Sequence, residues 1–344
     1  MQVDQVERLD AGQLSAVVAL SQAAEDVDGV APLSEQVLLT ARDGLMPVPV
    51  TGPTTGPIAG LVTGSHTGWP HFLAYDGTHL AGYAHLEQGL AGEAATAEVV
   101  VDPADRRRGV GTALIRALED APSPEAGTLQ SGAGTLQIWS HGHLDGARAL
   151  AIRDGYSNVR ELWAMRLSLR SGADSLPAVT LPEGFRSRPF VVGQDEDAWL
   201  RVNAHAFVDH AEQGRMTRHD LDLRIAEPWF DARGFILIED MRGAAPVLAA
   251  SHWTKIVPAA DPQVSPTQGE VYVVGVEPAY QGLGLGRAVT VLGLAHLRER
   301  GLAQAMLYVD ADNRAAVATY SRLGFTRFAV DVMYSHAIHQ PVPR

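Results

Sequence analysis

The feature that most constrains this chain is an internal repeat. The segment VVVDPADRRRGVGTA, residues 99–113, returns 175 residues later as VGVEPAYQGLGLGRA, residues 274–288. In both copies an apolar run enters a glycine-rich turn that opens a second apolar run. A helical pattern, a strand pattern and a helix ending in glycine and an aromatic residue follow each copy, at Gly155-Tyr156 and Gly324-Phe325. A repeat of this length indicates two copies of one domain rather than a solenoid of short units.

The length of the chain agrees with two domains. It has 344 residues, whereas single domains most often contain about 100–150 residues. The segment from Arg170 to Gly184 is rich in Gly, Pro and Ser and has no hydrophobic periodicity, which is typical of a boundary. We therefore expect an N-terminal domain over residues 1–170, a linker over 171–183 and a C-terminal domain over 184–344.

Hydrophobic periodicity predicts the same order of elements in both halves. In the first half it predicts helices over 11–24 and 35–41, strands over 71–75, 80–87 and 96–101, a helix over 109–118, a strand over 135–140, a helix over 147–153 and a strand over 158–169. In the second half it predicts a helix over 196–206, strands over 234–239, 247–256 and 270–276, a helix over 284–298, a strand over 305–309, a helix over 313–322 and a strand over 326–333.

Composition narrows the compartment and the partners. The formal net charge of −13 disfavours nucleic acids and anionic lipid surfaces, so an anionic ligand requires a local binding site. Without cysteine the chain has no disulfides and no thiolate metal ligands, which suits a reducing compartment. The charged N-terminus lacks the apolar core of a signal peptide, and no apolar run approaches the roughly 20 residues of a membrane span. We expect a cytoplasmic monomer that binds neither membranes nor nucleic acid.

The glycine-rich turn of the second half predicts a phosphate site. Gly282, Gly284 and Gly286 leave backbone N–H groups uncovered at the start of a predicted helix, where the helix dipole is positive. Two other phosphate motifs do not fit, because the spacing is G-x-G-x-G rather than the G-x-G-x-x-G of dinucleotide-binding turns, and GK[ST] is absent. An ordinary tight turn between a strand and a helix is the alternative.

The two turns share a pattern with a known superfamily. Gln281, Gly284 and Gly286 form [QR]-x-x-G-x-G between a predicted strand and helix, and Arg106, Gly109 and Gly111 repeat it. The pattern resembles the acetyl-CoA pyrophosphate loop of the GNAT N-acetyltransferases. The resemblance implies acetyl-CoA as cosubstrate and two tandem GNAT-fold domains of the α/β (α+β) class, each a mixed, mostly antiparallel sheet flanked by helices.

Several segments narrow the resemblance to one family. GEVYVVGVEP, LYVDADNRAAVATYSRLGF, HAEQG, EPWFD and, in the first half, SEQVL resemble the mycothiol synthase family of actinobacteria. Ala211 in HAEQG stands where that family usually has proline, so the chain departs from the family's pattern at this loop. The resemblance implies acetyl transfer to the cysteinyl amine of cysteinyl-glucosaminyl-inositol, the last step of mycothiol biosynthesis. Another small-amine or peptide N-acetyltransferase and a non-catalytic acetyl-CoA sensor are the alternatives.

Two residues of the second half can carry the proton transfers of amine acetylation. Glu270 opens the strand before the turn, where a carboxylate can accept the ammonium proton, although surface carboxylates also occur at strand starts. Tyr320 lies four residues before Gly324, and a phenol with a pKa of about 10 suits protonation of a thiolate; a core aromatic is the alternative. The resemblance implies general base and general acid. A backbone N–H on the strand from Val274 to Val276 is the expected oxyanion donor.

The resemblance also implies binding residues. For acetyl-CoA in the second half these are Val274, Gly275, Val276, Gln281, Gly282, Leu283, Gly284, Leu285, Gly286, Arg287, Asn313, Arg314, Ala315, Ala316, Val317 and Ala318. In the first half they are Val99, Val100, Val101, Arg107, Arg108, Gly109, Val110, Gly111 and Thr112. For the acceptor they are Glu35, Glu212, Lys255, Glu270 and Tyr308, and Glu35 belongs to the first half. Lys255 is the only lysine among 27 basic residues, so its site favours a compact ammonium over a guanidinium unless it is an incidental surface residue.

The first half lacks both proton-transfer groups. Ala95 stands 175 residues before Glu270, and Ala151 stands four residues before Gly155. We therefore expect this half to bind acetyl-CoA or only to support the second half. His141 and His143 are spaced as in some metal-binding tracts, but no acidic cluster adjoins them in the sequence and the second half has no histidine there, so we expect no metal.

Overall fold

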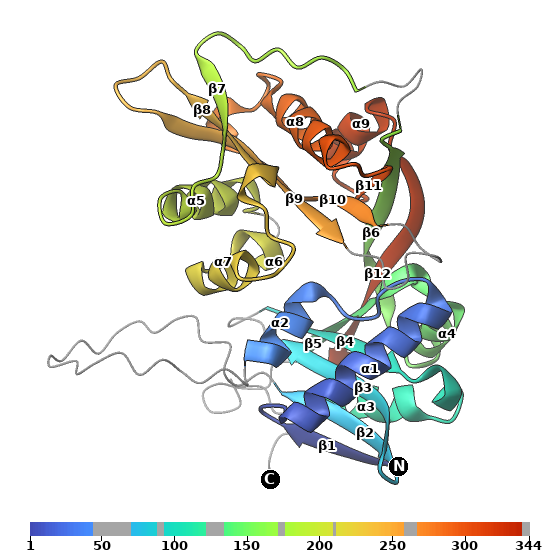
Figure 1. Cartoon of the computed structure of the whole chain (residues 1–344). Helices are drawn as coiled ribbons and strands as arrows, with labels where there is room; N and C mark the ends of the chain where they lie inside the picture. Colours follow the sequence, from blue (N-terminus) through green and yellow to red (C-terminus); the bar gives the residue numbers. More distant parts are fainter. Residues whose placement is uncertain are drawn as a thin grey trace, which may run out of the picture. The chain divides into compact units, whose positions relative to one another are not determined.

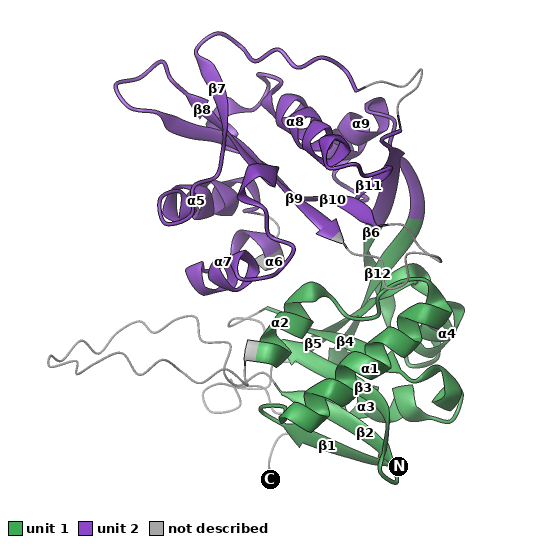
Figure 2. Cartoon of the chain, viewed as in Figure 1, with its two compact units in different colours: residues 1–162, 329–344 green, residues 163–328 purple. Residues whose placement is uncertain are grey.

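The computed structural model describes residues 1–43, 70–87, 93–121, 134–170, 176–208, 211–257 and 267–338. The chain forms two compact units (Figure 2): unit 1 contains Met1–Leu162 and Ala329–Arg344, and unit 2 contains Trp163–Phe328. This division differs from the boundary expected at 171–183, because unit 2 begins at Trp163 and most of the last strand, from Ala329, belongs to unit 1. Part of the expected linker, residues 171–175, lies outside the described residues.

Unit 1 is a sheet covered by helices on both faces. Its strands follow the order β1 (Gln2–Val6), β2 (His71–Asp76), β3 (His79–Glu87), β4 (Ala95–Val101), β5 (Gly134–Ser140) and β12 (Thr326–Ile338). All neighbours pair antiparallel except β4 and β5, which are parallel. The strand β6 (Ser157–Ser168) leads out of unit 1 into unit 2.

The helices of unit 1 divide its core into two clusters. The helices are α1 (Ala11–Asp28), α2 (Glu35–Asp43), α3 (Val110–Glu119) and α4 (Asp145–Arg153). Val17 of α1 and Val37 of α2 pack with Tyr83 on one face of the sheet. Leu114 of α3 and Ala151 of α4 pack on the other face. Burial of such apolar surface is the main force that holds helices on a sheet.

Unit 2 repeats this arrangement. Its strands follow the order β6, β11 (Gln304–Asp310), β10 (Gln268–Val276), β9 (Val247–Val257), β8 (Phe235–Asp240) and β7 (Phe185–Pro189). The strands β7 to β10 pair antiparallel, and β10 pairs parallel with β11. Its helices are α5 (Glu196–Ala206), α6 (Ala211–Gly214), α7 (Arg218–Ile225), α8 (Leu285–Glu299) and α9 (Arg314–Arg322).

The two faces of the unit 2 sheet carry different helices (Figure 1). Trp199 of α5 and Leu221 of α7 pack on one face around the fully buried Trp253 of β9. The other face carries α8 and α9, whose Leu294 and Val317 pack with residues of β10 and β11. A ligand held at the edge between β10 and β11 would therefore meet α5 to α7 on one side and α8 and α9 on the other.

The structure confirms the mixed, mostly antiparallel sheets flanked by helices, and it contains every element predicted from periodicity. The sequence did not predict β1, β7, α6 or α7. Both strands lie at sheet edges with little burial, so they lack the alternation of a half-buried strand, and α7 is mostly polar.

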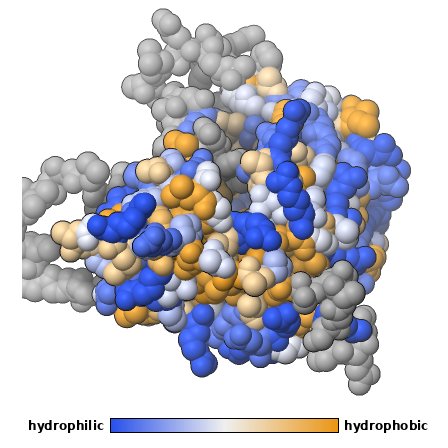
Figure 3. Space-filling model, turned by 90° about the horizontal axis from the view of Figure 1, so that it is seen from above, coloured by the Kyte–Doolittle hydropathy of each residue, from blue (hydrophilic) through white to orange (hydrophobic). Residues whose placement is uncertain are grey.

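In the part of the chain that the structure describes, no helix is long and apolar enough to cross a bilayer. Figure 3 shows hydrophilic and hydrophobic residues interspersed over the face it presents.

Candidate active site

The turn after β10 presents bare backbone amides. Gly282 and Gly284 adopt positive φ angles of 81° and 79°, a conformation in which glycine has no steric penalty. Gly284 begins α8 without a side-chain hydrogen bond to the helix, so the amides of Leu285, Gly286 and Arg287 have no capping group and lack partners within the helix. This geometry suits a diphosphate, because the amides and the helix dipole both favour an anion.

The edge of β10 that leads into this turn is open. Within the described strands β10 pairs with β11 only at Gly269 and Glu270, opposite Ala305 and Met306. The register with β9 shifts between Val271 and Val273, which marks a β-bulge. Bulges bend and twist a strand and often occur beside active sites. The stretch Val274, Gly275 and Val276 can therefore pair with an extended ligand, as the resemblance implies for the pantetheine chain.

Three of the expected acceptor-binding residues lie on one face of unit 2. Glu270 of β10 is directly opposite Lys255 of β9 and beside Met306 of β11, and Tyr308 follows Met306 by two residues. Paired residues on adjacent strands, and residues two apart on one strand, point to the same face. Gly269 faces Leu297 of α8, so Glu270, Lys255 and Tyr308 face the side of α5 and α7.

The other two expected acceptor-binding residues lie on other elements. Glu35 opens α2 in unit 1. The preceding Ser34 donates its backbone N–H to Glu98 Oε2 at 2.6 Å. Glu212 lies in the short helix α6, and its side chain lies outside the described residues. The Asn203 amide of α5 anchors α6 by donating to the Gln213 carbonyl at 2.7 Å.

Tyr320 lies on the opposite face of the sheet. It lies on α9 and packs against the cluster that contains Val271 and Leu307, with its ring 5.8 Å from that of Phe325. Burial raises the pKa of Tyr320 to about 12. The phenol therefore stays protonated around neutral pH, as a proton donor must. Its hydroxyl has no hydrogen-bond partner among the described residues.

The start of α9 carries the remaining expected acetyl-CoA contacts of unit 2. Asn313 caps the helix by accepting the Ala316 N–H at 3.1 Å. Arg314 and Ala315 are exposed, and the residues from Ala316 to Ala318 are half-buried. This helix start is therefore open to a ligand on its outer side.

Unit 1 forms a similar turn with different side chains. Gly109 begins α3 with a φ of 90° and no side-chain cap, so the amides of Val110, Gly111 and Thr112 are arranged like those of α8. Arg107 occupies the place of Gly282 and adopts a φ of 63°. A left-handed conformation costs a residue with a side chain roughly 1–2 kcal/mol, and such strain often accompanies a functional site.

The arginines of the RRR run are mostly engaged within unit 1. Arg106 donates to both Asp28 oxygens at 2.7 Å, and Arg108 bonds Asp105 and, at 3.0 Å, Asp76. Arg107 is exposed and has no ion-pair partner among the described residues. Of the three, Arg107 alone is thus available to attract a phosphate.

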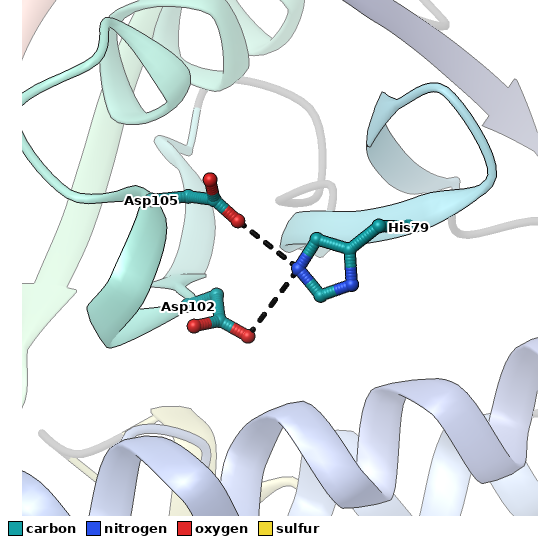
Figure 4. Close-up of side chains that lie close together, drawn as sticks. All are labelled: His79, Asp102 and Asp105. Carbon is teal, nitrogen blue, oxygen red and sulfur yellow. Dashed lines mark hydrogen bonds and ion pairs between the residues drawn. The ribbon is translucent and has the colours of Figure 1, made fainter.

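A group with potential metal ligands lies beside this turn (Figure 4). His79 Nε2 lies 3.0 Å from Asp105 Oδ2 and 3.5 Å from Asp102 Oδ2. Asp105 also bonds Arg108, and Asp102 accepts the Ala104 N–H at 2.8 Å. These contacts tie β3 to the turn, and we interpret the group as an ion-pair network.

Sequence reasoning missed a buried polar row in unit 1. The residues His71, His85 and Glu98 are cross-strand neighbours on β2, β3 and β4 and are all buried. His141 lies 3.7 Å from Glu98 Oε2 and 3.0 Å from Asp331 Oδ2. The only sequence signal was a charged residue inside an apolar strand, at Glu98.

The charges of this row are compensated inside the protein. Burial opposes a charged His141, but the hydrogen bond with Asp331 and the negative charges of Glu98 and Asp331 outweigh it and raise the pKa of His141 to about 10. Although burial favours the neutral acid, His141 and Ser34 lower the pKa of Glu98. The expectation that His141 lacks acidic neighbours is wrong. The fold brings Glu98 and Asp331, which are distant in the sequence, next to His141.

The sequence of this chain is similar to those of known acetyltransferases. Residues 55–128 and 204–325 match the model of the acetyltransferase (GNAT) family. A mycothiol acetyltransferase from Thermomonospora curvata is 48% identical over 94% of this chain and 93% of its own length. One from Geodermatophilus obscurus is 47% identical over 97% and 98%.

Solved structures share the tandem fold. A tandem GNAT protein from the clavulanic acid biosynthesis pathway has a TM-score of 0.67 and 16% identity, over 99% of this chain and 100% of that one. A GCN5-related N-acetyltransferase from Sphaerobacter thermophilus has a TM-score of 0.61 and 23% identity, over 98% and 96%. At these identities the likeness concerns the fold.

Proposed function

The chain belongs to the acetyltransferase (GNAT) family and, within it, to the mycothiol acetyltransferases, and from this premise we propose its reaction. It transfers the acetyl group of acetyl-CoA to the cysteinyl amine of cysteinyl-glucosaminyl-inositol and so completes mycothiol. The observation that carries the proposal is the arrangement in unit 2. Lys255, Glu270 and Tyr308 share one face where β10 parts from β11, directly before the glycine turn.

The amides that begin α8 hold the diphosphate of acetyl-CoA, and the open edge of β10 holds its pantetheine arm. Three features support this assignment: the left-handed glycines at 282 and 284, the uncapped helix start and the short β10–β11 ladder. Acetyl-CoA supplies an activated acetyl thioester at the edge of β10. A backbone N–H of Val274 to Val276 then donates a hydrogen bond to the thioester carbonyl oxygen.

Glu270 prepares the nucleophile. The acceptor amine is protonated around neutral pH, and its nitrogen lone pair becomes available only after a proton leaves. Glu270 accepts that proton, directly or through one water, as a positioned carboxylate can. The freed amine forms the new C–N bond with the acetyl carbon, and the C–S bond of the thioester breaks.

Tyr320 completes the proton transfers. The departing thiolate of CoA takes the proton of the Tyr320 hydroxyl. The attacking nitrogen then carries one proton more than the product amide, and this proton passes to the phenolate, directly or through water. The raised pKa of about 12 keeps Tyr320 in its donating form before each turnover. Glu270 and Tyr320 approach from opposite faces, so neither group competes for the position of the other.

Unit 1 binds acetyl-CoA or supports unit 2 without performing chemistry. Ala95 begins β4 opposite Leu136, at the place that Glu270 occupies on β10. Ala151 is a buried core residue of α4. Neither side chain can exchange a proton, so the reaction belongs to the residues of unit 2.

The proposal is tested by offering acetyl-CoA with three acceptors in parallel: cysteinyl-glucosaminyl-inositol, simple amines, and a peptide with a free N-terminus. Product masses and CoA release are measured for each. We expect the pseudodisaccharide to gain one acetyl group with a much higher kcat/KM than the others. If only the simple amines or the peptide are acetylated, the proposed acceptor is wrong. If the protein binds acetyl-CoA but forms no product, the alternative of a non-catalytic acetyl-CoA sensor is favoured.

A further inference from the structure

Lys255 lies in a corner formed by two aromatic rings. Its Nζ is 4.8 Å from the ring centre of Trp229 and 5.1 Å from that of Tyr272. The two rings lie 5.2 Å apart at an interplanar angle of 67°. Both distances are within the range of a cation–π interaction, so each ring attracts the same ammonium.

The shape of this corner explains why the chain has a lysine here. A guanidinium is planar and stacks flat on one ring, whereas an ammonium is compact and can contact two rings at a steep angle. Lys255 is the one lysine among the 27 lysine and arginine residues of the chain, and the others are arginine. Attraction by a ring is less directional than a hydrogen bond, so the ammonium can donate hydrogen bonds while both rings attract it.

A buried arginine fixes one wall of the corner. Arg224 of α7 is 6% exposed, and its Nε donates to the Tyr272 hydroxyl at 2.7 Å. Its Nη1 donates to the Asp220 carbonyl at 3.0 Å, which ties the guanidinium to its own helix. Charge-assisted hydrogen bonds of this length are among the stronger ones. The Tyr272 ring, which contacts Lys255, is therefore held in place through its hydroxyl.

Tyr272 also lies within the bulge of β10. The register with β9 shifts between Val271 and Val273, so Tyr272 is the additional residue. Tyr272 follows Glu270 by two residues, so both side chains lie on the same face of the strand. The Tyr272 ring therefore lies beside the ammonium of Lys255, the residue that stands opposite Glu270.

We propose that Trp229, Tyr272 and Arg224 are positioning residues that hold the Lys255 ammonium beside Glu270 for acceptor binding. The inference rests on the proposed function. The ammonium donates hydrogen bonds to hydroxyl groups of the acceptor, and its charge repels the acceptor ammonium toward the Glu270 carboxylate. Selectivity for a polyhydroxylated amine then depends on the two rings as well as on the charged residues that touch the acceptor.

The test measures the KM for the acceptor in variants that keep Lys255 and in variants that also carry Lys255→Ala. Trp229→Leu removes one wall, and we expect the acceptor KM to rise about 5- to 30-fold, as the loss of a partly desolvated cation–π contact implies, with the KM for acetyl-CoA within about twofold. Trp229→Phe retains a ring and should recover most of the loss. In the Lys255→Ala background, Trp229→Leu should have little further effect, because the cation it orients is absent.

Tyr272→Phe provides a second variant that keeps a ring at the corner but removes the oxygen that Arg224 binds. We expect an intermediate rise in the acceptor KM. Lys255→Arg keeps the charge, and we expect it to restore less than half of the affinity lost in Lys255→Ala. Thermal unfolding of each variant shows that it is folded before kinetics are measured.

The outcomes separate this inference from the proposed function. If the unmodified protein fails to acetylate the pseudodisaccharide, the proposed function is wrong. If it does so and Trp229→Leu leaves the acceptor KM unchanged, or raises it by the same factor with Lys255 present as in the Lys255→Ala background, the positioning role is wrong. A full recovery of affinity by Lys255→Arg would also overturn it.

Discussion

The two glycine turns of the chain differ in what surrounds them more than in their own shape. Both begin a helix with a left-handed glycine, at Gly109 and Gly284, and neither helix has a side-chain cap. Position 107 keeps the left-handed conformation although it carries an arginine. The turn of unit 1 thus retains its backbone where the sequence opposes it, which indicates that the backbone shape itself is useful.

The strands that lead into the two turns differ between the units, although the turns themselves have similar backbones. In unit 2 the ladder between β10 and β11 ends after two pairs and β10 bulges. In unit 1 the ladder between β4 and β5 continues over four pairs, to Glu98 opposite Trp139, and the register with β3 is regular. Glu98 then contacts His141 beyond the end of β5. Unit 1 therefore combines a more closed edge with alanine at both of the positions that carry Glu270 and Tyr320 in unit 2.

The largest expected effect concerns the proton-transfer residues of unit 2. Tyr320→Phe and Glu270→Gln should each lower kcat about 100-fold or more, because general acid or base catalysis contributes roughly 10²–10⁴-fold. The dissociation constant of acetyl-CoA, measured by calorimetry, should change little. The matched control is Tyr156→Phe in unit 1. It removes a hydroxyl that donates to Glu119 at 2.8 Å, and we expect kcat to stay unchanged. Unchanged turnover in both unit 2 variants would remove the proposed mechanism.

The polar row of unit 1 predicts a large effect on stability. Asp331→Asn weakens the interaction with His141 and leaves a buried charge less compensated, so we expect a loss of about 3–5 kcal/mol in the free energy of unfolding. The exposed pair of Asp145 and Arg148 provides the control, since Asp145→Asn should cost less than about 1 kcal/mol. Denaturant unfolding of both variants measures the difference. Equal losses would show that the row adds no stability.

The same row gives stability a dependence on pH. The pKa of His141 is raised to about 10 in the folded protein, from about 6.5 in an unfolded chain. The folded state therefore binds an additional proton between these values. This contribution is complete below pH of about 6.5 and is lost as the pH rises toward about 10. Unfolding measured at intervals across this window should show a steeper loss for the unmodified protein than for His141→Gln.

Local patterns predicted the turns and the elements but not the long-range partners. The periodicity of residues 326–333 indicates a strand, yet nothing in it specifies that β12 pairs with β5 of unit 1. Asp331 and His141 are 190 residues apart, so their contact depends on that pairing. The roles of Glu270 and Tyr320 stay predictions, based on the place of Glu270 in the strand before the turn, on the four-residue spacing of Tyr320 from Gly324 and on the family resemblance. Arg224, on a short polar helix, had no comparable signal.

A smaller effect is expected from Gly284→Ala. The added Cβ meets nothing within 4 Å, but φ is 79°, so the substitution tests backbone shape without a steric clash. We expect a cost of roughly 1 kcal/mol for the left-handed conformation, and weaker acetyl-CoA binding because the amides of the turn shift to relieve it. Calorimetry on Gly284→Ala and on Gly109→Ala compares the two units. If only the first variant loses affinity, acetyl-CoA binds in unit 2 alone.

The smallest effect concerns Arg107, at the place of Gly282. Arg107→Gly relieves the left-handed strain of roughly 1–2 kcal/mol but gives the unfolded chain more freedom, which offsets about 0.5–1 kcal/mol. We expect a net stabilisation of about 0.5 kcal/mol, measured by denaturant unfolding. If Arg107 also attracts a phosphate, acetyl-CoA binding to unit 1 should weaken, and more so at low ionic strength, where charge attraction is less screened. A more stable variant with unchanged binding would show that unit 1 keeps the shape of the turn without using the charge.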